Sequence, residues 1–194
     1  INPKTFSQIS KDYLSVFDNV RVRHIMKDSK GNLWVSTYGE DGLICVDPYN
    51  NVTNYNDSTD GILGGRCRLT KELSDGTIVV ACNMGLSFLK DGVVVNSLGE
   101  SEGLKNQYIL SLEERDDGSI LAGSDGDGIY IIKNGRVAGH IGEAEGLNTA
   151  VILRIVKCTG GYLYVTSNAL YYDNGSNIRE LKNFPYSNNY DIQI

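Results

Sequence analysis

Hydrophobic and polar residues alternate along most of this chain in short runs, with a period of two residues rather than 3.6. Ile120 and Ala122 lie two positions apart in one run, and Tyr162 and Tyr164 in another, each run being bounded by turn residues. This spacing predicts short β-strands. No strand candidate reaches the roughly ten residues of an amphipathic helix, which argues against a solenoid of helical pairs.

The strand pattern recurs four times. The copies occupy residues 22–48, 68–92, 110–135 and 153–175. One glycine in each copy keeps the same phase, with spacings of 45, 42 and 43 residues: Gly31, Gly76, Gly118 and Gly161. A second marker has spacings of 43, 43 and 41 residues: Gly42-Leu43, Gly85-Leu86, Gly128-Ile129 and Ala169-Leu170. Four strands in about 43 residues is the size of one β-propeller blade.

Each repeat is expected to contain four antiparallel strands, named a to d here in chain order. In the third repeat they are predicted near 109–115, 119–124, 128–132 and 136–141. Three connections between strands c and d contain residue pairs that tolerate positive φ angles, which predicts tight two-residue turns. These pairs are Asp91-Gly92, Asn134-Gly135 and Asn174-Gly175.

The predicted fold is therefore all-β: a β-propeller with four-stranded antiparallel blades, of which the chain holds about four and a half. Whole blades are expected at 20–60, 66–99, 108–142 and 151–183. Residues 1–19 are expected to supply a d strand and a d–a loop from a preceding blade, and 188–194 to begin the next. We expect a segment of a larger propeller whose open blade edges favour self-association. A compact, self-closed propeller is the alternative.

The first repeat also resembles a known family. It reads Asp28-Ser-Lys-Gly31-Asn-Leu-Trp34-Val-Ser-Thr37, followed by Gly42-Leu43. This string is similar to the two-component regulator propeller repeat, in which an Asp precedes Gly-Asn-Leu-Trp-Ile-Gly-Thr and then Gly-Leu. Later copies depart from this string: the position of Trp34 is occupied by Val79, Leu121 and Tyr164. The family places that tryptophan in blade-to-blade packing, so we expect Trp34 in the core rather than against a sugar.

The resemblance implies an extracytoplasmic sensory propeller, periplasmic or on the cell surface, in a bacterial membrane receptor. In such receptors a Tyr-rich β-sandwich, a membrane span and a cytoplasmic histidine kinase or diguanylate cyclase follow, so the remainder of the receptor chain is an implied partner. The family's sensors are commonly associated with glycan or oligosaccharide cues. A small polar or oligosaccharide ligand is therefore an expectation from the resemblance.

Composition and charge limit the classes of partner that the chain is expected to bind. With 18 Lys and Arg against 24 Asp and Glu, the net charge is -6 and the sequence pI is about 4.9. This balance argues against nucleic-acid binding. No apolar run approaches the roughly 20 residues of a membrane helix, so we expect no membrane insertion of this segment. The 22 glycines are explained by the many turns.

Strand direction predicts where a ligand would bind. Antiparallel strands place the a–b and c–d turns on one face of the disc and the b–c and d–a connections on the other. The second face has the longer and more varied loops, which suit binding on a rigid scaffold. Its candidate residues offer planar hydrogen-bonding groups and aromatic rings. They are Tyr38, Glu40, Asp41, Arg66, Asn83, Asn106, Tyr108, Asp125, Asp127, Asn148 and Asn168. Met84 also lies in a b–c loop. Alternatively, the Asn and Asp residues only stabilise their own loops.

Other chemistry is weakly indicated. Ser124-Asp-Gly-Asp-Gly128 alternates carboxylates as calcium loops do, but it lacks further ligand positions, so a turn is favoured over a metal site. Neither His24 nor His140 lies near a nucleophile motif. We predict no catalytic residue and no cofactor. A related propeller class includes antibiotic lyases, and this keeps an enzyme open by analogy of fold alone.

The four cysteines, Cys45, Cys67, Cys82 and Cys158, show no Cys-x-x-Cys spacing, which argues against zinc. Cys67 and Cys82 fall on strands a and b of one blade. A turn centred on Ser74-Asp75 would place them opposite each other, whereas a turn centred one residue later would offset them. A disulfide and two buried free thiols therefore both remain open.

Two functions fit these observations. The first is a ligand-sensing domain of a membrane signalling receptor, and the second is a non-catalytic scaffold for protein interaction or dimerisation.

Overall fold

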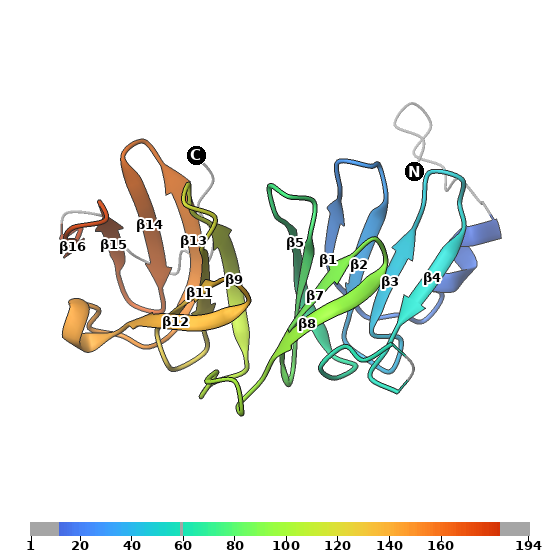
Figure 1. Ribbon diagram of the computed structural model, residues 1–194, viewed down its shortest axis with the longest axis horizontal. Helices are drawn as coiled ribbons and strands as arrows, with labels where there is room; N and C mark the ends of the chain where they lie inside the picture. Colours follow the sequence, from blue (N-terminus) through green and yellow to red (C-terminus); the bar gives the residue numbers. More distant parts are fainter. Residues whose placement is uncertain (1–11, 59, 183–194) are drawn as a thin grey trace.

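The computed structural model describes residues 12–58 and 60–182, in which sixteen strands form four antiparallel sheets (Figure 1). The first sheet contains β1 (Val22–Lys27), β2 (Leu33–Thr37), β3 (Leu43–Val46) and β4 (Val52–Tyr55). The second contains β5 (Cys67–Glu72), β6 (Ile78–Cys82), β7 (Gly85–Lys90) and β8 (Val93–Leu98). The third contains β9 (Ile109–Glu114), β10 (Ile120–Ser124), β11 (Ile129–Lys133) and β12 (Arg136–Ile141). The fourth contains β13 (Ile152–Cys158), β14 (Gly161–Thr166), β15 (Leu170–Asp173) and β16 (Ile178–Glu180).

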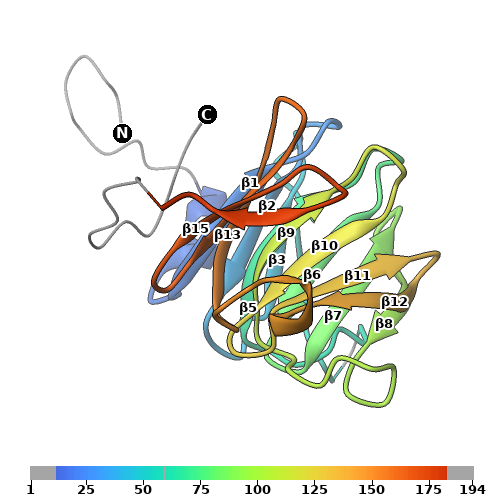
Figure 2. The same ribbon diagram turned by 90° about the vertical axis from the view of Figure 1, so that its left-hand side faces the viewer.

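Each sheet is a four-stranded meander, so the predicted all-β propeller blade is confirmed. The first strands of neighbouring sheets contact one another in the order β1, β5, β9 and β13, and they line the inner side of the arc (Figure 2). The strands of the third repeat lie within a residue of their predicted positions. In Figure 1 the β1–β2 and β13–β14 turns point upward, and the β4–β5 and β8–β9 connections lie at the lower edge.

Two of the three predicted two-residue turns are confirmed, and the third needs correction. Asp91-Gly92 and Asn134-Gly135 adopt the expected pairs of positive φ angles. Asn174-Gly175 does not form a two-residue turn, because Asp173 pairs with Ile178 and the loop has four residues. The Asn174 side chain accepts hydrogen bonds from the backbone N–H groups of Ser176 and Asn177, and this bonding stabilises the wider loop.

The first described segment, Asp12–Phe17, is a 3-10 helix named η1. A second 3-10 helix, η2 (Glu143–Glu145), lies in the connection from β12 to β13. A d strand and a d–a loop are expected over residues 1–19; residues 1–11 lie outside the described residues, and in the described part of this range the chain forms η1 and no strand. The new a strand expected at 188–194 also lies outside the described residues.

The hydrophobic core lies between the sheets. One cluster joins the first and second sheets, a second joins the second and third, and a third joins the third and fourth. Alternate residues of one strand enter different clusters: Ile120 and Ala122 of β10 pack toward the second sheet, and Leu121 packs toward the fourth. The middle strands are consequently buried on both faces, which explains why β6 and β10 have no exposed residue.

The outer face of the first sheet is covered by η1 and the residues after it. Val35, Ile44 and Val46 are buried there, with Val16 and Phe17 packed against them. Trp34 points the other way, into the cluster between the first and second sheets, and is 4% exposed. The expectation that Trp34 belongs to the core is therefore correct.

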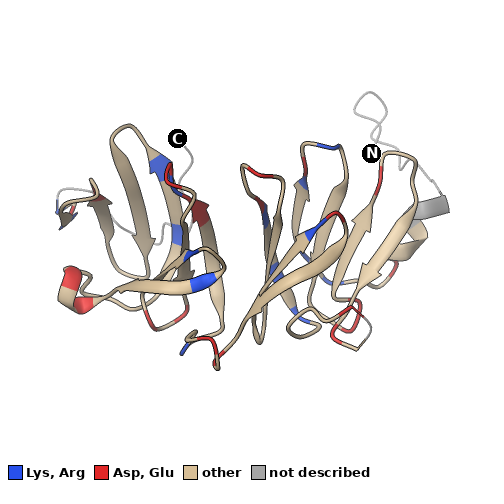
Figure 3. Ribbon diagram, viewed as in Figure 1, with Lys and Arg blue, Asp and Glu red and all other residues tan. Residues whose placement is uncertain are grey.

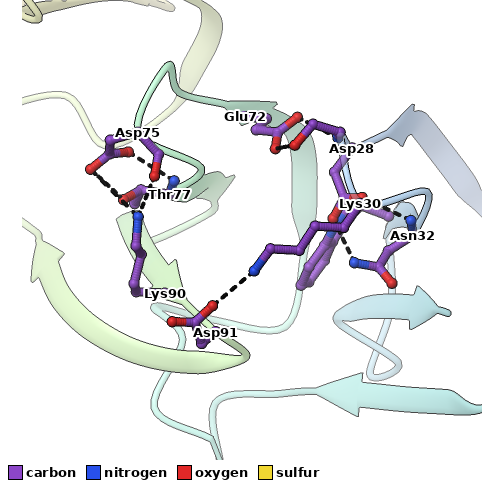
Figure 4. Close-up of polar contacts among 10 residues, drawn as sticks. Asp28, Lys30, Asn32, Glu72, Asp75, Thr77, Lys90 and Asp91 are labelled. Atoms are coloured by element: carbon purple, nitrogen blue, oxygen red, sulfur yellow. Dashed lines mark hydrogen bonds and ion pairs between the residues drawn. The ribbon is translucent and has the colours of Figure 1, made fainter.

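Trp34 needs a hydrogen-bond acceptor in this buried position, and Asp28 supplies it. The indole Nε1–H donates to Asp28 Oδ2 over 2.8 Å, and Asn32 donates its backbone N–H and its Nδ2–H to the same carboxylate (Figure 4). Burial acts to raise the pKa of Asp28, but the hydrogen bonds from Trp34 and Asn32 hold it below its usual range. The Asp28 carboxylate is therefore ionised, and both of its oxygens accept hydrogen bonds.

A polar contact between blades repeats at the a–b turns. Ser29 donates its backbone N–H and its Oγ–H to the carboxylate of Glu72, at the end of the next a strand (Figure 4). Ser74 makes the same two hydrogen bonds to Glu114, one blade later. We call this contact the turn latch.

At the junction between the third and fourth blades, the turn latch has its polarity inverted. Asp116 stands where the serine would be, and Lys157 stands where the glutamate would be. The Lys157 Nζ bonds Asp116 Oδ1 at 2.5 Å. Both positions differ together, so the contact between the two blades is retained.

Cys67 and Cys82 lie directly opposite each other in the β5–β6 pairing. At the turn end, Glu72 pairs with Ile78, a register that would offset the cysteines by one residue. A β-bulge at Arg68 restores them to opposite positions, and the two Sγ atoms lie 2.7 Å apart. Both thiols are buried. The alternative in which the two cysteines are offset is thus wrong.

We expect Asp28→Asn to lower the free energy of unfolding by about 1–3 kcal/mol at pH 7, because charge-assisted hydrogen bonds to a buried indole are weakened. The folded-state pKa is depressed, so this stabilisation is present above about pH 4 and is lost as the pH falls through the lowered value. Urea unfolding at pH 7 and near pH 3 should show the difference between the two proteins shrinking. Asp47→Asn is the control, since Asp47 accepts similar bonds from Tyr49 and Asn51 in an exposed turn.

Cys67 and Cys82 should form a disulfide when the protein is treated with a small disulfide oxidant. The two thiols lose two protons and two electrons, the oxidant is reduced to its thiols, and the protein mass falls by about 2 Da. Closing this loop should raise the free energy of unfolding by up to about 3 kcal/mol. Alkylation of the denatured oxidised protein should modify only Cys45 and Cys158, and modification of all four cysteines would contradict the pairing.

Candidate functional site

The b–c and d–a connections form one face of the molecule, and an open hollow of about 990 Å³ lies there between the first two blades. Figure 3 shows acidic residues in the connections at this lower edge. Residues of four connections line the hollow: the segment before β1, the β2–β3 turn, the β4–β5 connection and the β6–β7 turn. Four of the predicted binding residues are among them: Tyr38, Glu40, Arg66 and Asn83.

Tyr38 lines this hollow, and hydrogen bonds and a β-bridge hold its backbone to Arg21 and Arg66. Its N–H donates to the carbonyl of Arg21 over 2.8 Å, and it forms an isolated β-bridge with Arg66 of the next blade. The backbone N–H of Arg66 is in turn held by Asn83 Oδ1 at 3.1 Å. The Tyr38 ring is therefore positioned by two blades at once.

Three guanidinium groups surround the Tyr38 ring. The Cζ atoms of Arg21 and Arg66 each lie 5.3 Å from the ring centre, and that of Arg23 lies 4.8 Å away. These distances are in the range of cation–π attraction to a tyrosine. All three arginine residues are exposed.

A second cavity, of about 460 Å³, lies where the four inner strands converge. Each inner strand has a β-bulge near its start, at Arg23, Arg68, Leu110 and Leu153. These four residues all line the cavity. A bulge redirects one side chain away from the sheet face. The four equivalent bulge residues therefore line the same central cavity, and they are arginine in the first two blades and leucine in the third and fourth.

His24 follows the first bulge and lines the same cavity. Its Nδ1 accepts the backbone N–H of Thr70 over 3.2 Å. Burial lowers the pKa of His24 from its ordinary value, and the nearby charge of Arg154 lowers it further. A proton on Nδ1 would remove the acceptor that Thr70 uses.

The other predicted residues divide into two groups. Asp127 and Asn148 line a cavity of about 420 Å³ near β12 and η2, between the third and fourth blades. The rest lie outside the lining of these hollows on the same face: Asp41, Asn106, Tyr108, Asp125 and Asn168. Asn106 bonds the Asp125 carbonyl and the Tyr108 N–H, and so stabilises its own loop. Assignment of these residues to ligand binding stays a prediction.

The segment 124–128 forms a closed turn. Ser124 Oγ donates to the Gly128 carbonyl over 2.9 Å and accepts the N–H of Asp127. The Asp127 carboxylate accepts the hydroxyl of Tyr130 at 2.5 Å. Among the described residues, no three His, Cys, Asp or Glu side chains are grouped so as to hold a metal ion.

Arg21 and Arg23 were not among the predicted site residues, although the sequence contains a signal for them. Arg21-Val-Arg23 and Arg66-Cys-Arg68 place an Arg-x-Arg tripeptide at the same phase of the first two repeats, immediately before and within strand a. In a regular strand, residues two positions apart share one face of the sheet. The β-bulges at Arg23 and Arg68 break this alternation, and both bulge residues line the central cavity.

Comparison with protein families gives one match. The model described as "Two component regulator propeller" matches residues 16–39. The first blade contains one copy of this repeat. The match covers the last two residues of η1 and all of β1 and β2, and it includes Arg21, Tyr38 and Gly39 of the candidate hollow. The comparison with curated proteins gives no match.

Solved structures with similar folds include two extracellular domains from B. thetaiotaomicron. One is the extracellular domain of a hybrid two component system, with a TM-score of 0.71 and 18% identity over 82% of this chain and 23% of its own. The other is the extracellular domain of a one component system, with a TM-score of 0.68 and 15% identity over 84% and 25%. This chain thus spans about a quarter of their length. At these identities the likeness shows the propeller fold alone.

A third structure is an enzyme. Virginiamycin B lyase from Staphylococcus aureus has a TM-score of 0.64 and 14% identity over 82% of this chain and 55% of its own. This likeness again shows the fold and not the activity.

In the described residues, no helix has the length and apolar character to cross a membrane.

We expect the free energy of unfolding to fall as the pH decreases from about 7 to about 5, because His24 binds its proton less readily in the folded than in the unfolded state. His24→Gln should flatten this dependence, whereas His140→Gln, on the exposed strand β12, should keep it. Chemical unfolding at half-unit pH intervals provides the measurement. An unchanged pH dependence in His24→Gln would show that other groups cause it.

Proposed function

We propose that this chain is part of the extracytoplasmic sensory region of a bacterial membrane signalling receptor, and that it binds a small polar or glycan-like ligand on its b–c/d–a face. The receptor would be of the histidine kinase or diguanylate cyclase type. The regulator propeller repeat and the fold shared with extracellular sensor domains support the first part of this proposal.

One observation supports ligand binding above the others. Residues from two blades, far apart in the sequence, line a single open hollow together with the aromatic ring of Tyr38. Tyr38 supplies a face for stacking, and Glu40, Arg66 and Asn83 supply hydrogen-bonding groups around it. A sugar combines apolar C–H faces with many hydroxyl groups, and this set of side chains suits both.

The position of the hollow also suits a sensor. Its residues are held by the β-bridge between Tyr38 and Arg66, which joins the first blade to the second. A ligand that bridges both blades would bind only one relative arrangement of the two sheets with full affinity. Ligand binding would then be coupled to the geometry of the blade junction.

Tyr38→Ala should weaken binding of a soluble oligosaccharide by about tenfold or more, because loss of an aromatic stacking surface costs about 1–3 kcal/mol in comparable sites. Arg66→Ala should weaken it similarly. The experiment is a thermal-shift screen of neutral and acidic oligosaccharides at millimolar concentration, followed by calorimetric titration of each hit. Tyr49→Ala is the matched control, because Tyr49 is 85% exposed in the β3–β4 turn on the opposite face.

A screen without any shift would contradict the glycan proposal. Equal affinity in Tyr38→Ala and the parent protein would place the ligand elsewhere on the molecule. In either case the face would be better explained as a protein-interaction surface.

A further inference from the structure

The hollow of about 990 Å³ lined by Tyr38, called the Tyr38 hollow from here on, has more positive charge around it than the overall composition suggests. The chain has a net charge of -6 and only eight arginines. Three of them, Arg21, Arg23 and Arg66, lie within 5.3 Å of one ring centre. The three like charges around one ring repel one another, and the attraction of each guanidinium group to the ring face opposes this repulsion.

None of the three arginines is neutralised within the described part of the chain. Ion pairs with carboxylates are formed there by Lys30, Lys71, Lys90, Arg115, Lys133 and Lys157. Glu40 and Asp57 line the same hollow, but neither forms an ion pair with Arg21, Arg23 or Arg66. The guanidinium N–H groups therefore remain available to a ligand.

The backbone fixes where these guanidinium groups are presented. Arg21 and Arg66 occupy equivalent positions before β1 and β5, and both are tied to Tyr38 through the backbone. Arg23 is the extra residue of the bulge in β1, and it contacts the Tyr38 ring while also lining the central cavity. The three arginines therefore extend from the hollow to the central cavity, which is also lined by Arg68, the bulge residue of β5.

The other junctions lack this arrangement. Asn83 and Asp125 occupy the position of Tyr38 in the second and third blades, and Val151 takes the position of Arg66 before the fourth blade. The bulges of β9 and β13 hold leucine. Among the three junctions that the structure describes, the basic cluster therefore occurs only at the first and is not a property of the repeat.

We propose that the ligand of this hollow is an acidic saccharide, and that its carboxylate or sulfate group binds between Arg21, Arg23 and Arg66 beside the Tyr38 ring. This inference rests on the proposed function and adds the chemical class of the ligand. Guanidinium groups recognise oxyanions through paired N–H donors. The oxyanion also offsets the mutual repulsion of the three cations, and the sugar ring lies against Tyr38.

The anion is tested first with inorganic sulfate, at constant ionic strength, by NMR of the arginine Nε–H groups. We expect saturable shifts at Arg21, Arg23 and Arg66 and none at Arg136 or Arg179. Arg23→Gln should weaken sulfate binding by about tenfold, since a charge-assisted donor pair is lost. Arg23→Lys should weaken it less, because the charge remains without the fork. Arg136→Gln, an exposed arginine at the start of β12, is the matched control.

The sugar is tested with trigalacturonate and its methyl ester, which have the same backbone with and without charge. Tighter binding of the acid, lost in Arg23→Gln and reduced by added salt, supports the proposal. The same titrations with a sulfated disaccharide distinguish sulfate from carboxylate recognition. Thermal unfolding of each variant separates loss of binding from loss of fold.

The outcomes distinguish this inference from the proposed function. Equal, non-saturable shifts at all eight arginines would overturn the anion site. If a neutral oligosaccharide then still binds in a Tyr38-dependent way, sugar sensing stands and its acidic specificity falls. If sulfate binds at the three arginines but no saccharide binds, acidic-sugar recognition is overturned together with glycan sensing.

Discussion

The structure depends on the burial of apolar side chains between neighbouring sheets. A four-stranded blade has two apolar faces and no interior, so its middle strands are protected from water only when another blade, or η1 at the first sheet, covers each face. The turn latches and the Tyr38–Arg66 bridge fix how the covered faces are aligned. The candidate site lies at such an alignment point, so its geometry follows from the packing of two blades and belongs to neither alone.

Most of the fold follows from the sequence because its signals are local. Alternating residues set the strands, and the glycine spacing sets the blade period, so the positions of β9–β12 could be predicted to within a residue. The β-bulges could not be predicted, because a bulge is one added residue that strand periodicity averages out. This difference explains the cysteine pair: the turn alone would have offset Cys67 from Cys82, and the bulge at Arg68 aligns them.

The candidate site shows the same division between local and distant signals. Tyr38, Glu40, Arg66 and Asn83 could be selected from the sequence as polar loop residues of one face. Their convergence on one hollow depends on how the blades pack, and no local pattern contains that information. Arg23 was missed for a related reason, since a regular strand would have directed it to a sheet face rather than toward the loops.

The inverted latch has a consequence for how repeats of this kind can diverge. Asp116 and Lys157 differ together from the serine and glutamate found at the two earlier junctions. Exchanging the order of the blades would set serine against lysine or aspartate against glutamate. A duplication or exchange that keeps these contacts must therefore keep both halves of a junction, one from each blade. The paired surfaces of two blades thus determine which blade can be the neighbour of which.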